Sequence, residues 1–151
     1  MGQVTHEQAN LLLKLYDLRR EARLREARAW FTSNFDAKTP EEVSKKYPMG
    51  SEANARFRMV VSYWDMAAGL VNRGLIDDDL FFENAGEAWF VWERLRELVP
   101  AMRAASKNPH AWGQLEALVK RFEQWQERRA QGNLAAMRQR MNPERSVTAT
   151  K

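Results

Sequence analysis

Apolar side chains recur every three or four residues along most of the chain, which is the spacing of one face of an α-helix. The first such segment runs from residue 6 to about residue 34 and contains no Gly or Pro that would end it. Thr5, with Gln8 three residues later, has the form of a capping box. The pattern therefore predicts one long helix with an apolar stripe of Leu11, Leu15, Leu18, Ala22 and Ala29.

Four later positions have the residue types that begin helices: Thr39, Ser51, Asp77 and Asn108. The first of these predicts a short connector that ends by Gly50. The second predicts a long helix ending before Gly74, and its wide apolar arc indicates a central position. The third predicts a helix that Pro100 kinks or restarts. The fourth, followed by Pro109, predicts a last long helix that runs toward residue 132.

No segment alternates apolar and polar residues over the length of a strand, so the sequence predicts an all-α fold. We expect a helical bundle of four main helices plus a short connector helix, most simply antiparallel and up-and-down. The predicted organisation is a single helical domain over residues 1–132, followed by a basic, polar, partly disordered tail over residues 133–151.

Composition indicates the number of domains and the cellular compartment. The chain has 151 residues and no cysteine, which suits one domain in a reducing compartment. No apolar stretch is long enough to cross a membrane, and the start lacks the pattern of a signal peptide. We therefore expect a cytoplasmic protein without a transmembrane segment.

Positive charge gathers at the C-terminal end. Residues 1–119 hold 16 Lys and Arg and 17 Asp and Glu, whereas residues 120–151 hold eight and three. Four arginines in this end follow one another without an intervening acid: Arg128, Arg129, Arg138 and Arg140. Such a run favours contact with acidic protein, nucleic acid or anionic lipid, although no recognition motif accompanies it.

The chain has more aromatic residues than one helix stripe holds. Phe82, Trp89 and Phe90 exceed the stripe of their segment and would face water in a simple monomeric bundle. They are candidates for contact with a partner or a second copy, the alternative being burial by the first helix. An aromatic ligand pocket is a weaker alternative, because aromatic stripes more often form core.

Catalytic residue sets are missing from the sequence. The only two histidines are His6 and His110, and there is no phosphate loop, nucleophile elbow or zinc helix. Asp79, Glu83 and Glu87 recur every four residues and form the best cation-site candidate, but a solvated helix face explains them better. We expect no enzyme activity, metal or cofactor.

Residues 57–125 contain LVNRGLIDDDLFF and then AWFVWERLRELVPAMR, that is, a turn from Gly74 to Asp77 and an aromatic helix from Trp89 to Arg103. In these motifs the segment resembles a family of bacterial helical domains of unknown function. Some members have a membrane-spanning segment before the domain, whereas the first helix here is too charged for that role. The resemblance implies a helical fold and transfers no activity.

Together these features predict a noncatalytic interaction or structural protein that self-associates or docks a protein partner through its first helix and surplus aromatics. The alternative is an accessory protein that binds nucleic acid or an anionic surface through its basic end.

Overall fold

The computed structural model describes residues 2–142, and every regular element in that range is a helix. The helices are α1 His6–Arg20, α2 Ala22–Asn34, α3 Pro40–Lys46, α4 Glu52–Asn72, α5 Asp78–Phe82, α6 Gly86–Leu95, α7 Val99–Ser106, α8 Gly113–Arg129 and α9 Asn133–Met141. The all-α prediction is confirmed. The expected division into four main helices and one connector is not confirmed, since this range holds nine helices.

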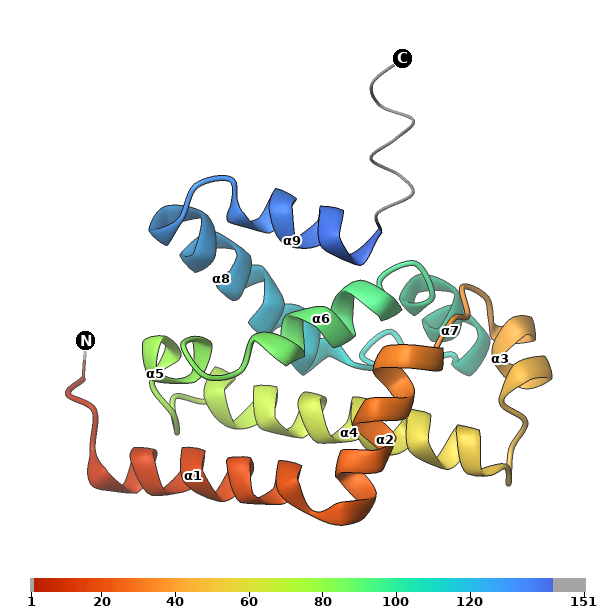
Figure 1. The fold of residues 1–151 in the computed structure, drawn as a ribbon, viewed down its shortest axis with the longest axis horizontal. Helices are drawn as coiled ribbons and strands as arrows, with labels where there is room; N and C mark the ends of the chain where they lie inside the picture. Colours follow the sequence, from red (N-terminus) through yellow and green to blue (C-terminus); the bar gives the residue numbers. More distant parts are fainter. Residues whose placement is uncertain (1, 143–151) are drawn as a thin grey trace.

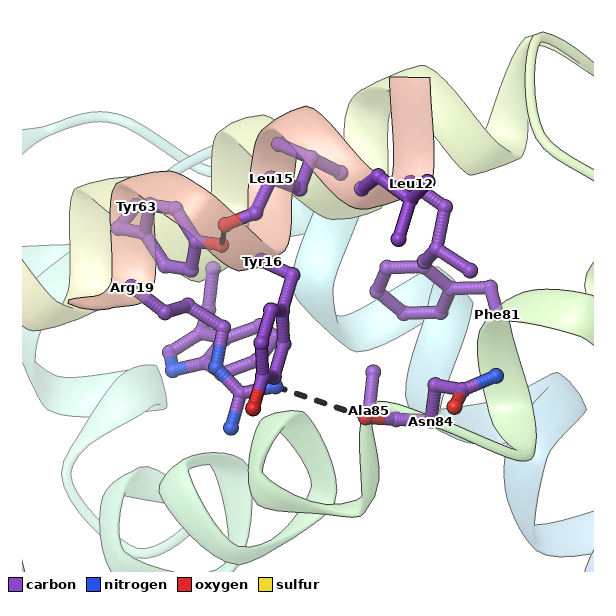
Figure 2. A pocket seen from close by; sticks show the side chains of 10 residues that line it. Leu12, Leu15, Tyr16, Arg19, Tyr63, Phe81, Asn84 and Ala85 are labelled. Carbon is purple, nitrogen blue, oxygen red and sulfur yellow. Dashed lines mark hydrogen bonds between the residues drawn. The ribbon is translucent and has the colours of Figure 1, made fainter. Parts of the chain in front are cut away.

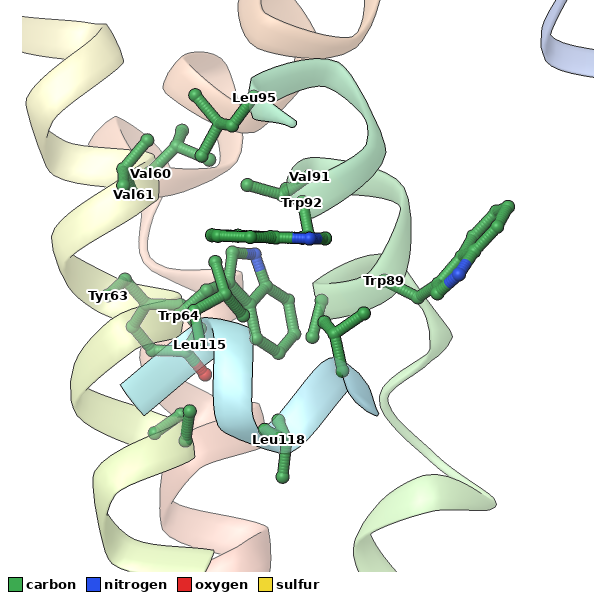
Figure 3. Close-up of a cluster of buried hydrophobic side chains, with 14 of the residues drawn as sticks. Val60, Val61, Tyr63, Trp64, Trp89, Val91, Trp92, Leu95, Leu115 and Leu118 are labelled. Atoms are coloured by element: carbon green, nitrogen blue, oxygen red, sulfur yellow. The ribbon is translucent and has the colours of Figure 1, made fainter. Parts of the chain in front are cut away.

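Helix α4 is the centre of the fold, as its wide apolar arc predicts. It packs most extensively against α8 and α2, while α1 runs along its other side and α9 folds back over α8 and α6 (Figure 1). Figure 3 shows the core between α4, α6 and α8, where Trp64 of α4 lies beside Trp92 of α6. Trp89 points away from this cluster, toward the side of α6 that faces α9.

The predicted helix starts are confirmed at four N-caps. Side-chain oxygens of Thr5, Thr39, Ser51 and Asp77 each accept a hydrogen bond from the backbone N–H three residues later. The capping box at the first helix is only half formed. Gln8 turns away from Thr5 and accepts instead from the backbone N–H of Asp77, at 2.9 Å. This contact ties the start of α1 to the turn after α4.

The predicted first helix is broken at Glu21, which corrects the expectation of one helix to residue 34. Glu21 has extended ψ (137°), and its carboxylate accepts from the N–H of Leu24 at 2.9 Å, so it ends α1 and caps α2. The bend changes which residues are buried. Leu24, Ala27 and Phe31 are buried on α2, whereas Ala22 and Ala29 of the predicted stripe are exposed.

Two later helices also differ from prediction. The helix expected after Asp77 is interrupted between Phe82 and Gly86, because Ala85 leaves the helical conformation. The last long helix begins at Gly113, not at Asn108, after a turn in which Trp112 has a positive φ of 56°. Pro100 restarts the chain as α7, as predicted.

The chain after residue 132 is helical where the structure describes it. Helix α9 buries Leu134 against the core. The remaining tail prediction, for residues 143–151, falls outside the described residues. Among the helices of residues 2–142, none combines the length and apolar character needed to cross a bilayer.

Candidate functional site

An open cavity of about 290 Å³ lies under α1, and we call it the α1 pocket. Its lining comes from four parts of the chain: Leu12, Leu13, Leu15, Tyr16 and Arg19 of α1, Tyr63 and Trp64 of α4, Phe81 of α5, and Asn84 and Ala85 of the following connection. Figure 2 shows side chains of α1 facing those of α5 and the connection across the opening. The walls are mostly apolar, with one cation at one end.

Two large apolar residues stand exposed at the rim of the α1 pocket. Leu13 is 61% exposed and Tyr16 is 51% exposed, although most aromatic residues of this chain are buried. Both lie off the stripe predicted for α1, and both line the same pocket as Tyr63 and Trp64 of α4. Exposed apolar side chains beside a cavity are typical of binding surfaces.

Tyr63 fixes α1 against α4 at the base of the pocket. Its hydroxyl donates to the backbone carbonyl of Leu15 at 2.5 Å, and only 7% of the residue is exposed. Burial raises the pKa of Tyr63 to about 12, against the opposing effect of Arg19 and Arg28. The phenol is therefore neutral at physiological pH and acts as a structural donor.

Arg19 lies at the edge of an ion cluster with Arg28 and Glu87. Arg28 makes the stronger pair, with Nε 2.8 Å from Glu87 Oε1, and Glu87 raises the pKa of Arg28. Arg19 is held by longer contacts, at 3.3 Å to Glu87 Oε2 and 3.5 Å to the carbonyl of Asn84. All three side chains are about one-fifth exposed or less. With two cations and one anion, the cluster is net positive.

The guanidinium of Arg19 is partly satisfied by hydrogen bonds within the chain. Its Nε atom is shielded from solvent and has no hydrogen-bond partner, and the group lies over the Trp64 ring, 5.1 Å from its centre. Trp64 Nε1 is also unpartnered, but Figure 3 shows it directed toward Trp92. Among the residues that line the α1 pocket, Arg19 is the one with a charged side chain.

The aromatic partner-contact candidates lie largely inside the chain. Phe82 is 5% exposed and packs against Phe122 and Trp125 of α8, and Trp89 is 2% exposed. Phe90 is half-buried and packs against the core. The expectation that Phe82 and Trp89 face outward is corrected, because α8 and α9 cover them.

The four arginines of the basic end divide into two groups. Arg138 and Arg129 are engaged: Arg138 donates to Glu93 and Glu123, while Arg129 lies over Trp125 and 3.5 Å from Glu83. Arg128 and Arg140 are exposed and make no ion pair within residues 2–142. Among the described residues, these two of the four candidates have exposed side chains without an ion pair.

Trp89 and Arg138, drawn from the two candidate sets, meet beneath α9. The Arg138 guanidinium lies 5.7 Å from the centre of the Trp89 ring, and both residues donate to Oε1 of Glu123. Beside them, a second open cavity of about 420 Å³ is lined by Phe90, Met137 and Met141 among others. We call the covered surface, formed by Trp89, Phe90 and Glu93 of α6 and Glu123 of α8, the α6–α8 face.

The three residues of the candidate cation site, Asp79, Glu83 and Glu87, each interact with different partner residues. Asp79 accepts from Trp125 Nε1 at 2.7 Å, Glu83 approaches Arg129, and Glu87 joins the arginine cluster. Within residues 2–142, no three His, Asp or Glu side chains are grouped so that they could hold a metal ion.

The sequence did not reveal the α1 pocket or the ion cluster at its edge. In that cluster, Arg28 and Glu87 are 59 positions apart, and no local spacing connects them. One signal was present: Leu13 and Tyr16 are large apolar residues that the predicted stripe of their helix leaves out.

Comparison with known proteins supplies the family. The model of DUF4760, a domain of unknown function, matches residues 4–122. The chain belongs to the DUF4760 family. The match extends beyond the segment that carried the resemblance and includes the whole α1 pocket, while α9 lies outside the matched residues. No curated protein and no solved structure matches the chain.

Proposed function

We propose that this DUF4760 chain is a noncatalytic interaction domain that docks a protein partner at the α1 pocket. The observation that carries the proposal is the exposure of Leu13 and Tyr16 above an apolar cavity. The pocket's polar side chains support binding over catalysis. Arg19 is a permanent cation and Tyr63 is a neutral phenol committed to a carbonyl, so neither is a ready proton acceptor.

Charge indicates which partner fits. Residues 14–28, which include the bend between α1 and α2, hold six Lys and Arg and three Asp and Glu, a net charge of +3. A second copy facing this surface would bring the same charge to it, which opposes a symmetric dimer here. An acidic segment with one large apolar side chain suits both the cavity and Arg19. We therefore assign the pocket to a partner segment of that kind.

A pair of labelled peptides tests the proposal on the full chain. One peptide carries Phe flanked by glutamates, and the other carries Phe flanked by glutamines. Fluorescence anisotropy at low salt is expected to show binding of the glutamate peptide about tenfold tighter than the glutamine peptide, equal to about 1.4 kcal/mol. If neither peptide binds, or both bind alike, the assigned partner is wrong.

Leu13→Glu provides the site-specific variant, because it removes apolar contact and repels an acidic peptide. Met49→Glu is its matched control, since Met49 is 79% exposed and lies in the turn between α3 and α4. We expect the first variant to weaken glutamate-peptide binding by about tenfold or more and the second to leave it unchanged. Equal loss in both variants would show a nonspecific charge effect.

A second candidate function is binding of nucleic acid or another anionic surface at the basic end. The exposure of Arg128 and Arg140 without ion pairs in residues 2–142 favours it. Arg128→Gln together with Arg140→Gln is then expected to weaken binding to a single-stranded oligonucleotide and to reduce its salt dependence. Binding that the double substitution leaves unchanged would remove this candidate.

A further inference from the structure

Helix α9 presents one side to the α6–α8 face in the spacing of a bound amphipathic helix. Leu134, Met137, Arg138 and Met141 stand at positions i, i+3, i+4 and i+7. Leu134 is 7% exposed, and both methionines pack against the core. Arg138 reaches Glu123 at 2.7 Å and Glu93 at 3.3 Å. This is the arrangement by which a helix enters an apolar groove.

The α6–α8 face keeps its internal hydrogen bonds without α9. Trp89 donates to Glu123 at 3.0 Å, and Arg96, which directly follows α6, contacts both Glu93 and Glu123. What α9 adds is cover for the apolar surface and a second cation for the two carboxylates. Without Arg138 the group would hold two acids and one cation. The face therefore attracts a helix that combines apolar residues with a positive charge.

Helix α9 is only weakly attached to the rest of the fold. The helix has nine residues, fewer than the roughly 12–15 that an isolated helix needs to be stable in water. It joins α8 through a turn at Gly132, which has a φ of +83°. Only Leu134 is fully buried among its residues. Local opening of α9 would leave the helices around α4 in contact with one another.

We propose that the α6–α8 face is a helix-binding site that α9 occupies in the free chain. Its partner is an amphipathic helix of another protein, with large apolar residues at the first, fourth and eighth positions and Lys or Arg at the fifth. Such a helix reproduces the contacts of Leu134, Met137, Met141 and Arg138 and replaces α9. This inference does not depend on the α1 pocket, which lies on other residues and takes an acidic segment.

The probe for the face is a labelled peptide with the sequence of residues 131–142, added to the full chain. Leu134→Asp loosens the resident helix, and Ala135→Asp is the matched control because Ala135 is exposed on the same helix. We expect the peptide to bind the Leu134→Asp chain at least about tenfold more tightly than the wild-type or Ala135→Asp chain. A peptide in which Glu replaces the arginine equivalent to Arg138 is expected to lose this binding. Equal binding to all three chains would overturn the proposal.

Hydrogen exchange of the wild-type chain tests the proposal independently if Leu134→Asp unfolds. Amides of residues 134–141 are expected to exchange at least about tenfold faster than those of residues 115–122, through opening of α9 alone. Equal rates would show that α9 opens only with the whole fold and would overturn the proposal. A wild-type dimer by light scattering that Leu134→Asp abolishes would assign the face to a second copy's α9 and overturn the foreign partner.

Discussion

Glu87 of α6 receives two hydrogen bonds from Arg28 of α2, with Nε 2.8 Å from Oε1 and Nη2 2.5 Å from Oε2. The same carboxylate accepts from Arg19 at the α1 pocket. One acid thus connects the bend between α1 and α2 to the helix that supports the α6–α8 face. Its removal leaves two partly buried cations without their counter-charge.

Glu87→Gln is therefore expected to destabilise the chain by about 1–3 kcal/mol, because charged hydrogen bonds in a shielded cluster are lost. Urea unfolding followed by circular dichroism measures the change. Glu83→Gln is the control, four residues earlier, where the acid is half-exposed and lies 3.5 Å from Arg129. That surface pair is expected to contribute less than about 1 kcal/mol. Similar losses in both variants would contradict the structural role of Glu87.

Tyr63 provides a prediction about pH. Its pKa of about 12 exceeds the ordinary value of 10.0, so the folded chain retains a proton that the unfolded chain releases between these values. Folding stability from this group is complete below pH 10 and falls as the pH rises toward 12. Absorbance titration of the wild-type chain and Tyr63→Phe is expected to differ by one phenol that ionises near pH 12. A difference centred near pH 10 would show that Tyr63 is not buried as described.

Glu21 provides a prediction in the acid range. The backbone N–H groups of Leu24 and Arg23 hold the pKa of this carboxyl below its ordinary value of 4.5. The cap therefore stabilises the bend above pH 4.5 and is lost as the pH falls through the lower, folded value. Carbon-detected NMR of the Glu21 carboxyl is expected to show a midpoint below 4.5. A midpoint at or above 4.5 would contradict the capping contact.

Gly132 is the glycine whose conformation matters most for α9. With a φ of +83°, Gly132→Ala strains the turn and is expected to cost about 1 kcal/mol. Gly86→Ala is the contrasting change, since Gly86 begins α6 and an added Cβ meets no atom within 4 Å. It is expected to be neutral or to stabilise by up to about 1 kcal/mol. Thermal unfolding of the two variants compares them, and equal midpoints would contradict the strained turn.

Helix starts were predictable because capping is local. Each predicted cap, from Thr5 to Asp77, needs only its own side chain and an N–H three residues away. The break at Glu21 was not predictable in this way. Glutamate is an uncommon cap, and no Gly or Pro marks the site. The bend depends on α2 packing against α4, a contact that only the folded chain contains.

The residues of the candidate sites show the same difference between local signals, which the sequence contains, and contacts between distant helices, which it does not. Sequence reasoning selected Trp89 and Arg138 separately, as a partner aromatic and an anion contact, because it had no means to place α9 over α6. It missed Arg19 and Arg28, whose shared partner Glu87 lies on a distant helix. Composition indicated a surplus of aromatic residues, whereas the large apolar side chains exposed at the α1 pocket are Leu13 and Tyr16.

The most direct test of the account is an NMR titration of the full chain with the glutamate peptide, compared with the same titration of Arg19→Gln. The docking proposal predicts that the largest shifts occur at Leu13, Tyr16 and Arg19, around the α1 pocket, and that they decrease strongly in the variant. Shifts confined to other surfaces, or a wild-type response that Arg19→Gln leaves unchanged, would contradict it.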